Sequence, residues 1–321
     1  MPASLHSELQ RELVRLGDKL GFLAIMEYTI ENLLPGYSPV IDVVWFYPLS
    51  EAQSLAISKV YDLWPYWKGS TALYPYAAFE ITASDATSKT VMSEIWNMKL
   101  SGFRYAFKVV PSKDPKHSDY MHKERAERIN RMLNYFSGIS DVFAVSIEEL
   151  QNAIGKVQNL EVKSYAEKPL KFRTPKLRDN SHNRVLRHLA EIGDRYGFIS
   201  VIEYTPRWLK KIEKSVTFIR HDVAWLSELP VNTEVQFKEF LKCLGVNPVR
   251  DVSPIEVLAF EVEVGTFDKH SIGSVLNLAK ISERGVLVIE NKMSNLVETV
   301  RIISSNRVGV KSIKELFREL K

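Results

Sequence analysis

The sequence predicts an α/β protein with two tandem domains, each of which has a mixed central sheet flanked by helices. Short segments occur twice in the same order, which indicates a duplication. The clearest pairs are LGDKLGFLAIMEYT with IGDRYGFISVIEYT, IDVVW with HDVAW, AAFEI with LAFEV, and VFAVSIEEL with VGVKSIKEL. In each copy strands follow one another first and then alternate with helices, a pattern typical of a mixed sheet with helices on both faces. A chain of 321 residues is also long enough for two domains.

The first copy is expected to begin with a helix, because Leu9, Leu13, Leu16 and Leu20 have the spacing of one helix face. Gly21 ends this helix. The later apolar runs predict, in order, strands at 22–30, 40–48 and 76–83, a helix at 89–100, a strand at 103–111, a helix at 122–136, a strand at 141–147 and a helix at 147–155. The predicted order is therefore α-β-β-β-α-β-α-β-α.

The second copy repeats this order. It predicts a helix at 182–196, strands at 198–205, 216–226 and 255–264, a helix at 271–282, a strand at 285–290, a helix at 293–303, a strand at 307–310 and a helix at 312–320. The segment between the copies is polar and basic and contains two prolines, which is typical of a linker or an exposed arm. We therefore expect a first domain at 1–154, a basic linker at 155–181 and a second domain at 182–321.

Composition and charge restrict the class of protein. Hydrophobic residues make up 45% of the chain and charged residues 26%, which is ordinary for a globular protein. The net charge of +4 permits a nucleic-acid partner without requiring one. Cys243 is the single cysteine, so an intramolecular disulfide is excluded. The N-terminus has no signal-peptide pattern and no apolar run is long enough to span a membrane, so we expect a cytoplasmic protein without a membrane partner.

Each copy places three carboxylates in apolar company on its consecutive predicted strands. They are Glu27, Asp42 and Glu80 in the first copy, and Glu203, Asp222 and Glu261 in the second. An ionised carboxylate in an apolar strand is costly unless it has a partner. One interpretation is structural hydrogen bonding. The other is a shared divalent cation, because Mg²⁺ prefers oxygen ligands and keeps water for a phosphate substrate. The recurrence of the whole set favours the cation.

The phrases IDVVW followed by AFEI, and HDVAW followed by LAFEVEV, resemble the core of the PD-(D/E)xK nuclease superfamily, which includes restriction enzymes and junction resolvases. The resemblance implies two restriction-endonuclease-like domains and hydrolysis of DNA phosphodiester bonds with Mg²⁺ or Mn²⁺. By position, it implies metal-binding pairs at Asp42 and Glu80 and at Asp222 and Glu261. Glu27 and Glu203 would match the additional acid that many members have.

The sequence departs from this pattern where the family has its signature lysine. Thr82 occupies that position in the first copy and Glu263 in the second. A glutamate can serve as a further ligand or base, whereas threonine cannot act as a base near neutral pH, so the second domain is favoured as the active one. Lys99 and Lys280 are alternative sources of the lysine, although an ordinary solvated helix lysine explains both. His221 is expected to face away from the neighbouring Asp222, because side chains alternate along a strand.

The sequence thus predicts a Mg²⁺-dependent DNA endonuclease, either a monomer with pseudo-dimeric halves or a homodimer. The alternative is an inactive nuclease-fold protein that binds DNA or docks a protein partner in repair, recombination or defence. A third possibility is a scaffold whose acids are neutralised by Arg or Lys side chains. Basic residues of the linker and of the predicted helix at 122–136 are the candidate DNA contacts. These are Lys171, Arg173, Lys176, Arg178, Lys123, Arg125, Arg128 and Arg131.

Overall fold

The computed structural model places the two copies in two compact units that share one topology. It describes residues 5–31, 36–82, 88–111, 141–160, 172, 175, 177–206, 208–209, 220–265, 269–282, 284–290, 294–305 and 307–320. The predicted helix at 122–136 and the start of the predicted strand at 216–226 lie outside these residues. Among the helices in this part of the chain, none is both long and apolar enough to cross a membrane.

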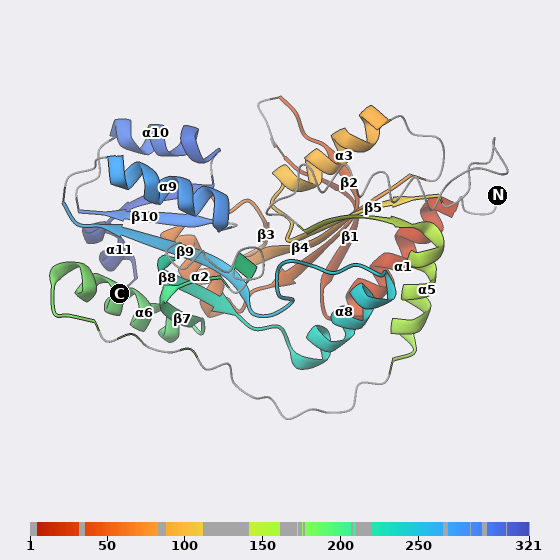
Figure 1. Cartoon of the computed structure of the whole chain (residues 1–321), viewed down its shortest axis with the longest axis horizontal. Helices are drawn as coiled ribbons and strands as arrows, with labels where there is room; N and C mark the ends of the chain where they lie inside the picture. Colours follow the sequence, from red (N-terminus) through yellow and green to blue (C-terminus); the bar gives the residue numbers. More distant parts are fainter. Residues whose placement is uncertain are drawn as a thin grey trace. The chain divides into compact units, whose positions relative to one another are not determined.

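Unit 1 is built on a sheet with the strand order β1-β2-β4-β5-β6. Its elements are α1 (Leu5–Lys19), β1 (Leu23–Thr29), β2 (Val40–Pro48), β4 (Thr71–Ile81), α3 (Ser88–Leu100), β5 (Tyr105–Val110), β6 (Asp141–Ser146), α5 (Ile147–Gln158) and α8 (Val231–Cys243). β1 and β2 are antiparallel, whereas β4, β5 and β6 are parallel. α1, α5 and α8 cover one face of the sheet and α3 lies on the other (Figure 1).

Unit 2 has the equivalent sheet, with the order β7-β8-β9-β10-β11. Its elements are α2 (Glu51–Val60), β3 (Trp67–Lys68), α6 (Ser181–Arg195), β7 (Ile199–Tyr204), β8 (His221–Ser227), β9 (Ile255–Glu263), α9 (Lys269–Ile281), β10 (Gly285–Ile289), α10 (Ser294–Ser304), β11 (Val308–Ser312) and α11 (Ile313–Glu319). β7, β8 and β9 are antiparallel neighbours, and β9, β10 and β11 are parallel. α9 and α10 lie on one face and α6 and α11 on the other (Figure 1). The prediction of a mixed sheet flanked by helices is therefore confirmed for both copies.

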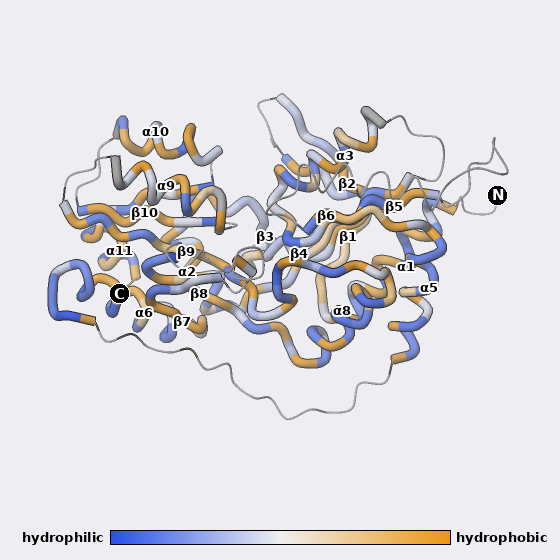
Figure 2. Tube along the Cα trace, in the orientation of Figure 1, coloured by the Kyte–Doolittle hydropathy of each residue, from blue (hydrophilic) through white to orange (hydrophobic). Residues whose placement is uncertain are grey.

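Local sequence explains these elements. β5 and β10 are buried throughout and β4 and β9 at all but one end residue, whereas α5 and α6 alternate between hydrophobic and hydrophilic residues (Figure 2). A Ser-Ile pair recurs where the last strand of each copy ends and the closing helix begins. Ser146 and Ser312 cap α5 and α11 in capping boxes with Glu149 and Glu315.

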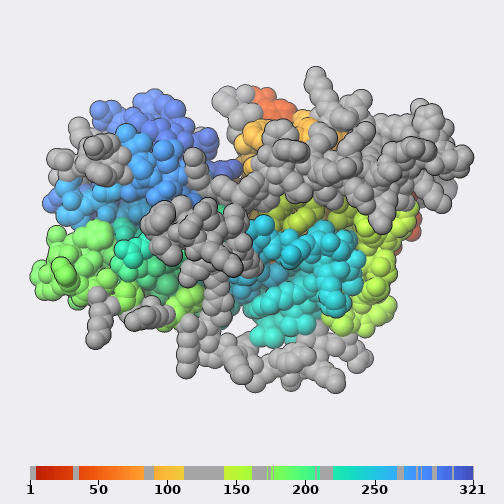
Figure 3. All heavy atoms as spheres, viewed as in Figure 1, coloured from red at the N-terminus to blue at the C-terminus, as the bar shows by residue number. Residues whose placement is uncertain are grey.

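The two units are not the contiguous halves of the chain. Unit 1 comprises residues 1–48, 74–166 and 230–252, and unit 2 comprises residues 49–73, 167–229 and 253–321. The helix that follows the second strand of each copy therefore belongs to the unit of the other copy. These helices are α2 and α8. In the space-filling view, α8 in cyan lies directly beside α5 in yellow-green, within unit 1 (Figure 3). The compact units thus differ from the ranges 1–154 and 182–321 expected from the sequence.

Both exchanged helices are absent from the predicted element order, which ran directly from the second strand to the third. The reason is that polar side chains occupy some of their buried positions. In α2 these are Gln53 and Ser54, and in α8 they are Thr233 and Gln236. An apolar stripe at helical spacing is therefore weak in both segments.

Trp45 and Trp225 are core residues, because both side chains have 0% exposure. Each indole Nε1 donates to a backbone carbonyl 3.1 Å away, from Leu13 or Leu189 of the first helix of its copy. A recurring glycine makes room for the ring. A Cβ added at Gly17 would lie 2.5 Å from Trp45 Nε1.

We expect Gly17→Ala to destabilise the protein by about 1–3 kcal/mol, because the added methyl overpacks this contact. Urea unfolding measures the change. Gly155→Ala is the matched control, since Gly155 also lies in a helix but a Cβ there meets no atom within 4 Å. That control should be neutral or slightly stabilising. Equal stabilities for the two variants would show that the indole does not require the glycine.

Candidate functional site

The first two strands of each copy place a glutamate opposite an aspartate. In unit 1 the pairs Met26–Val43 and Tyr28–Ile41 flank this point, so Glu27 lies opposite Asp42. The equivalent flanking pairs in unit 2 are Ile202–Val223 and Tyr204–His221, which put Glu203 opposite Asp222. Glu27 and Glu203 have φ angles of 47° and 54°, in the left-handed region that non-glycine residues seldom adopt. Such strain persists only where surrounding structure imposes it, and it recurs in both units.

The aspartate of each pair is held beside the glutamate of the next strand. In unit 1, Oδ2 of Asp42 accepts a hydrogen bond of 2.6 Å from the backbone N–H of Ile81, which follows Glu80. In unit 2, Oδ2 of Asp222 accepts the equivalent bond of 2.8 Å from Val262, which follows Glu261. The structure therefore brings together the two pairs that the sequence singled out.

These pairs have unusual electrostatics. Burial raises the pKa of Glu80 to about 9, and the neighbouring charge of Asp42 adds to the effect while Lys108 opposes it. Burial also raises the pKa of Glu261 to about 7, although its hydrogen bond with His221 acts in the opposite direction. Both glutamates thus lie where a second negative charge is unfavourable without a cation.

Unit 1 has a buried lysine on β5 that the sequence analysis did not single out. Lys108 of β5 is paired in register with Glu80 of β4, and its side chain has 0% exposure. Its Nζ lies 2.5 Å from Oε2 of Glu94 on α3. Of the two alternative lysines expected from the sequence, the structure describes the side chain of one. Lys99 lies over the ring of Trp96, and the side chain of Lys280 is outside the described residues.

Unit 2 has a buried histidine instead. His221 has 0% exposure, and its Nδ1 lies 3.4 Å from Oε1 of Glu261 while its Nε2 lies 2.9 Å from Oγ of Ser282. The sequence analysis expected His221 to face away from Asp222, and it did not anticipate this contact with Glu261. Strand alternation fixes only the direction of the Cα–Cβ bond, so it does not exclude a contact between the imidazole and the long side chain of Glu261.

Each unit consequently places one buried basic group against its second acid, but from different strands. Lys108 comes from β5 and His221 from β8. In unit 2 the partner of Glu261 on the adjacent parallel strand is Leu287, the register position that Lys108 has in unit 1. The basic group near the second acid therefore comes from a different position in each copy.

A further recurring residue was missed by the sequence analysis. His6 Nε2 lies 3.2 Å from Oδ1 of Asp42, and His182 Nε2 lies 3.3 Å from Oδ2 of Asp222. The signal was present, because each histidine stands at the start of the first helix in its copy, eleven residues before the repeated Gly-Asp-x-x-Gly segment that begins at Gly17 and Gly193. The hydrogen bond with Asp222 raises the pKa of His182 to about 9.

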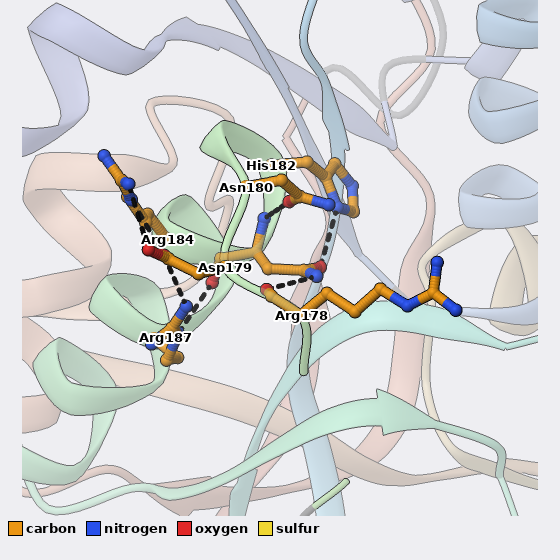
Figure 4. A network of polar contacts seen from close by, with 7 residues as sticks. Arg178, Asp179, Asn180, His182, Arg184 and Arg187 are labelled. Atoms are coloured by element: carbon orange, nitrogen blue, oxygen red, sulfur yellow. Dashed lines mark hydrogen bonds and ion pairs between the residues drawn. The ribbon is translucent and has the colours of Figure 1, made fainter. Parts of the chain in front are cut away.

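The start of α6 holds His182 through a local polar network (Figure 4). Asn180 caps the helix by accepting a bond from the Asn183 backbone, and Asn183 donates in turn to the carbonyl of Arg178. Asp179 accepts bonds from Arg184 and Arg187, as Figure 4 shows. The Arg178 side chain extends away from the other labelled residues (Figure 4). Arg178 is exposed. The other candidate DNA contacts, Lys171, Arg173, Lys176, Lys123, Arg125, Arg128 and Arg131, lie outside the described residues.

The remaining acids have individual environments. Glu27 is exposed, whereas Glu203 forms an ion pair of 3.1 Å with Arg220. Oε1 of Glu263 accepts a hydrogen bond of 2.7 Å from Ser274 on α9. Thr82, the equivalent of Glu263 in the first copy, is buried.

Within the described ranges, no group of three or more His, Cys, Asp or Glu side chains is arranged to hold a metal ion. The acids that the structure brings together are pairs. No family model, curated protein or solved structure matches the chain. The resemblance to the PD-(D/E)xK superfamily therefore stays a prediction.

Proposed function

We propose that the protein is a divalent-metal-dependent nuclease that hydrolyses phosphodiester bonds of DNA. One observation carries the proposal. Both units hold an aspartate and a glutamate side by side on neighbouring strands, with a strained glutamate opposite the aspartate. Backbone strain and closely paired carboxylates both cost free energy. Both repeats within the chain nevertheless have them at equivalent positions.

The residues fit Mg²⁺ or Mn²⁺. Asp42 and Glu80, or Asp222 and Glu261, offer hard oxygen ligands, and Mg²⁺ is commonly bound by only one or two carboxylates together with water and substrate phosphate. The raised pKa of Glu80 beside Asp42 marks a place where a cation would relieve repulsion between the two carboxylates. When bound, the ion would polarise the phosphodiester and lower the pKa of an attacking water.

The geometry supports unit 1 as an active unit, whereas the sequence alone favoured the second domain. The missing lysine at position 82 was the reason to doubt the first domain, and Lys108 supplies a buried cation beside Glu80. In unit 2, Glu203, Glu261 and Glu263 have Arg220, His221 and Ser274 as partners. On the first strand of each sheet, Glu203 of unit 2 is paired with Arg220, whereas Glu27 of unit 1 is exposed to solvent.

We expect Mg²⁺- or Mn²⁺-dependent cleavage of supercoiled, linear or branched DNA by the purified protein. Asp42→Asn should lower the cleavage rate at least about 100-fold, since it removes a ligand without changing shape. Asp222→Asn measures how much of the cleavage rate depends on unit 2. Glu148→Gln and Glu298→Gln, which alter exposed helix carboxylates, are matched controls and should leave the rate unchanged.

The pattern of losses assigns the active unit. Loss with Asp222→Asn alone would move the activity to unit 2, and loss with both would indicate two working sites. Absence of cleavage by the unmodified protein with either metal and every DNA form would refute the nuclease.

A second candidate is a nuclease-fold protein that binds DNA, or docks a protein in a DNA-processing complex, without cleaving. The ion pair of Glu203 with Arg220 and the contact of Glu261 with His221 favour it, because these acids already have partners. Fluorescence anisotropy with labelled DNA distinguishes this candidate. Binding that weakens steeply with salt, together with no cleavage, would support it.

A further inference from the structure

The helix α8 completes the core of unit 1 although it comes from the second copy. Phe237 and Phe240 of α8 both have 0% exposure. The ring of Phe237 lies 5.0 Å from that of Tyr76 and 6.0 Å from that of Phe22, and the ring of Phe240 lies 5.7 Å from that of Trp45. Aromatic rings of this size dominate the apolar area that a core buries.

The segment that follows α8 is also bound to unit 1. The backbone N–H groups of Val249 and Arg250 donate to the Asp141 carboxylate at 2.5 and 2.9 Å. Further on, Tyr76 Oη donates to the carbonyl of Val252 at 3.0 Å. Buried backbone groups need such partners, so this segment is specified by side chains of the first copy.

The helix α2 makes the corresponding contacts in unit 2. Nε2 of Gln53 donates to the carbonyl of Gly197 at 2.9 Å, and Oη of Tyr61 donates to the carbonyl of Arg307 at 2.9 Å. Beyond the helix, the guanidinium of Arg284 lies 4.6 Å from the centroid of the Trp64 ring. Residues of the first copy therefore fill unit 2 as residues of the second copy fill unit 1.

The exchange is reciprocal at the level of single contacts. Thr233 in the first turn of α8 donates to the carbonyl of Leu20, directly after α1. Gln53 in the first turn of α2 donates to the carbonyl of Gly197, two residues beyond the end of α6. Because α1 and α6 are equivalent helices, each exchanged helix occupies the same place in the unit that receives it.

We propose that the two halves of the chain are obligate binding partners, so that residues 1–160 and 177–321 form a stable complex without a covalent connection. The interaction surface on the first half is the face formed by α1, α5 and the aromatic residues Phe22, Trp45 and Tyr76. Its occupant is α8. The reciprocal surface on the second half receives α2. Neither half can bury its own core without the helix of the other.

The test is to cut the linker of the full chain. A specific protease site is inserted between residues 160 and 177, and the protein is cut in native buffer and examined by size-exclusion chromatography with light scattering. Both fragments should elute together near the 36.8 kDa of the intact chain and separate only in denaturant. Separate elution in native buffer, or precipitation of the cut chain, would overturn the proposal.

Variants of α8 link the association to the proposed surface. Phe237→Ala in the cut protein should weaken association of the fragments at least tenfold, because it removes a fully buried ring. Lys238→Ala changes the next residue, which is exposed, and should leave association unchanged. If the Phe237 variant does not fold as an intact chain, Leu55→Ala and Ile57→Ala make the same comparison on α2, with exposures of 50% and 0%. Equal association of the buried and exposed variants would contradict the proposed surface.

Discussion

Lys108→Met is expected to lower the free energy of unfolding by about 3–5 kcal/mol, because removing one member of a buried ion pair leaves the other charge without compensation. Lys108 has 0% exposure and lies between the carboxylate of Glu94, at 2.5 Å, and its register partner Glu80. Methionine has nearly the same length, so the change removes the charge and little packing. Urea unfolding at pH 7 measures the effect.

Two further variants show whether charge is the cause. In Lys108→Met/Glu94→Gln both partners are neutral, and we expect much of the lost stability to return. Lys156→Met alters an exposed lysine of α5 and should change stability little. A double variant no more stable than Lys108→Met would mean that the lysine acts through packing rather than through its charge.

The second large effect is a fall in stability as the pH rises from about 5 to about 9. The pKa of Glu80 is raised from 4.5 to about 9, and that of Glu261 from 4.5 to about 7. Between the unfolded and folded pKa values the folded state binds the additional proton, so each unit of rising pH costs about 1.4 kcal/mol for such a group. His182 acts in the same direction, because its raised pKa adds stability at low pH that is lost as the pH rises through about 9.

Unfolding by urea at several pH values between 5 and 9 measures this dependence. Glu80→Gln cannot ionise, so its stability should fall less steeply with pH than that of the unmodified protein. Glu148→Gln is the control at an exposed helix position and should keep the original slope. Stability that rises between pH 6 and 8, or parallel slopes for Glu80→Gln and the unmodified protein, would show that these glutamates ionise freely in the folded state.

Local patterns in the sequence were sufficient for most elements. Apolar runs located β2 at residues 40–48 and placed Asp42 within it, and the repeated segments indicated that Asp222 has the equivalent place. The acid pairs were anticipated from the recurring carboxylates and the family resemblance, whereas the register of β8 with β9, which is irregular between Trp225 and Leu226, is seen only in the structure. The recurrence of His6 and His182 was also visible in the repeated segments. The sequence did not show that each histidine lies beside the aspartate of its copy.

By itself, then, the sequence determined the duplication, the mixed α/β character of each copy and the strand positions of the paired acids, because periodicity and repetition are local properties of a chain. Only the tertiary structure decided which basic group meets each acid. Lys108 is distant in sequence from Glu80, and His221 is distant from Glu261. The local sequence around either basic residue does not indicate which acid it will lie near. The tertiary structure also decided the exchange of α2 and α8. A buried face shows that a helix has a partner, but the identity of that partner depends on shape and hydrogen bonds made across the whole chain.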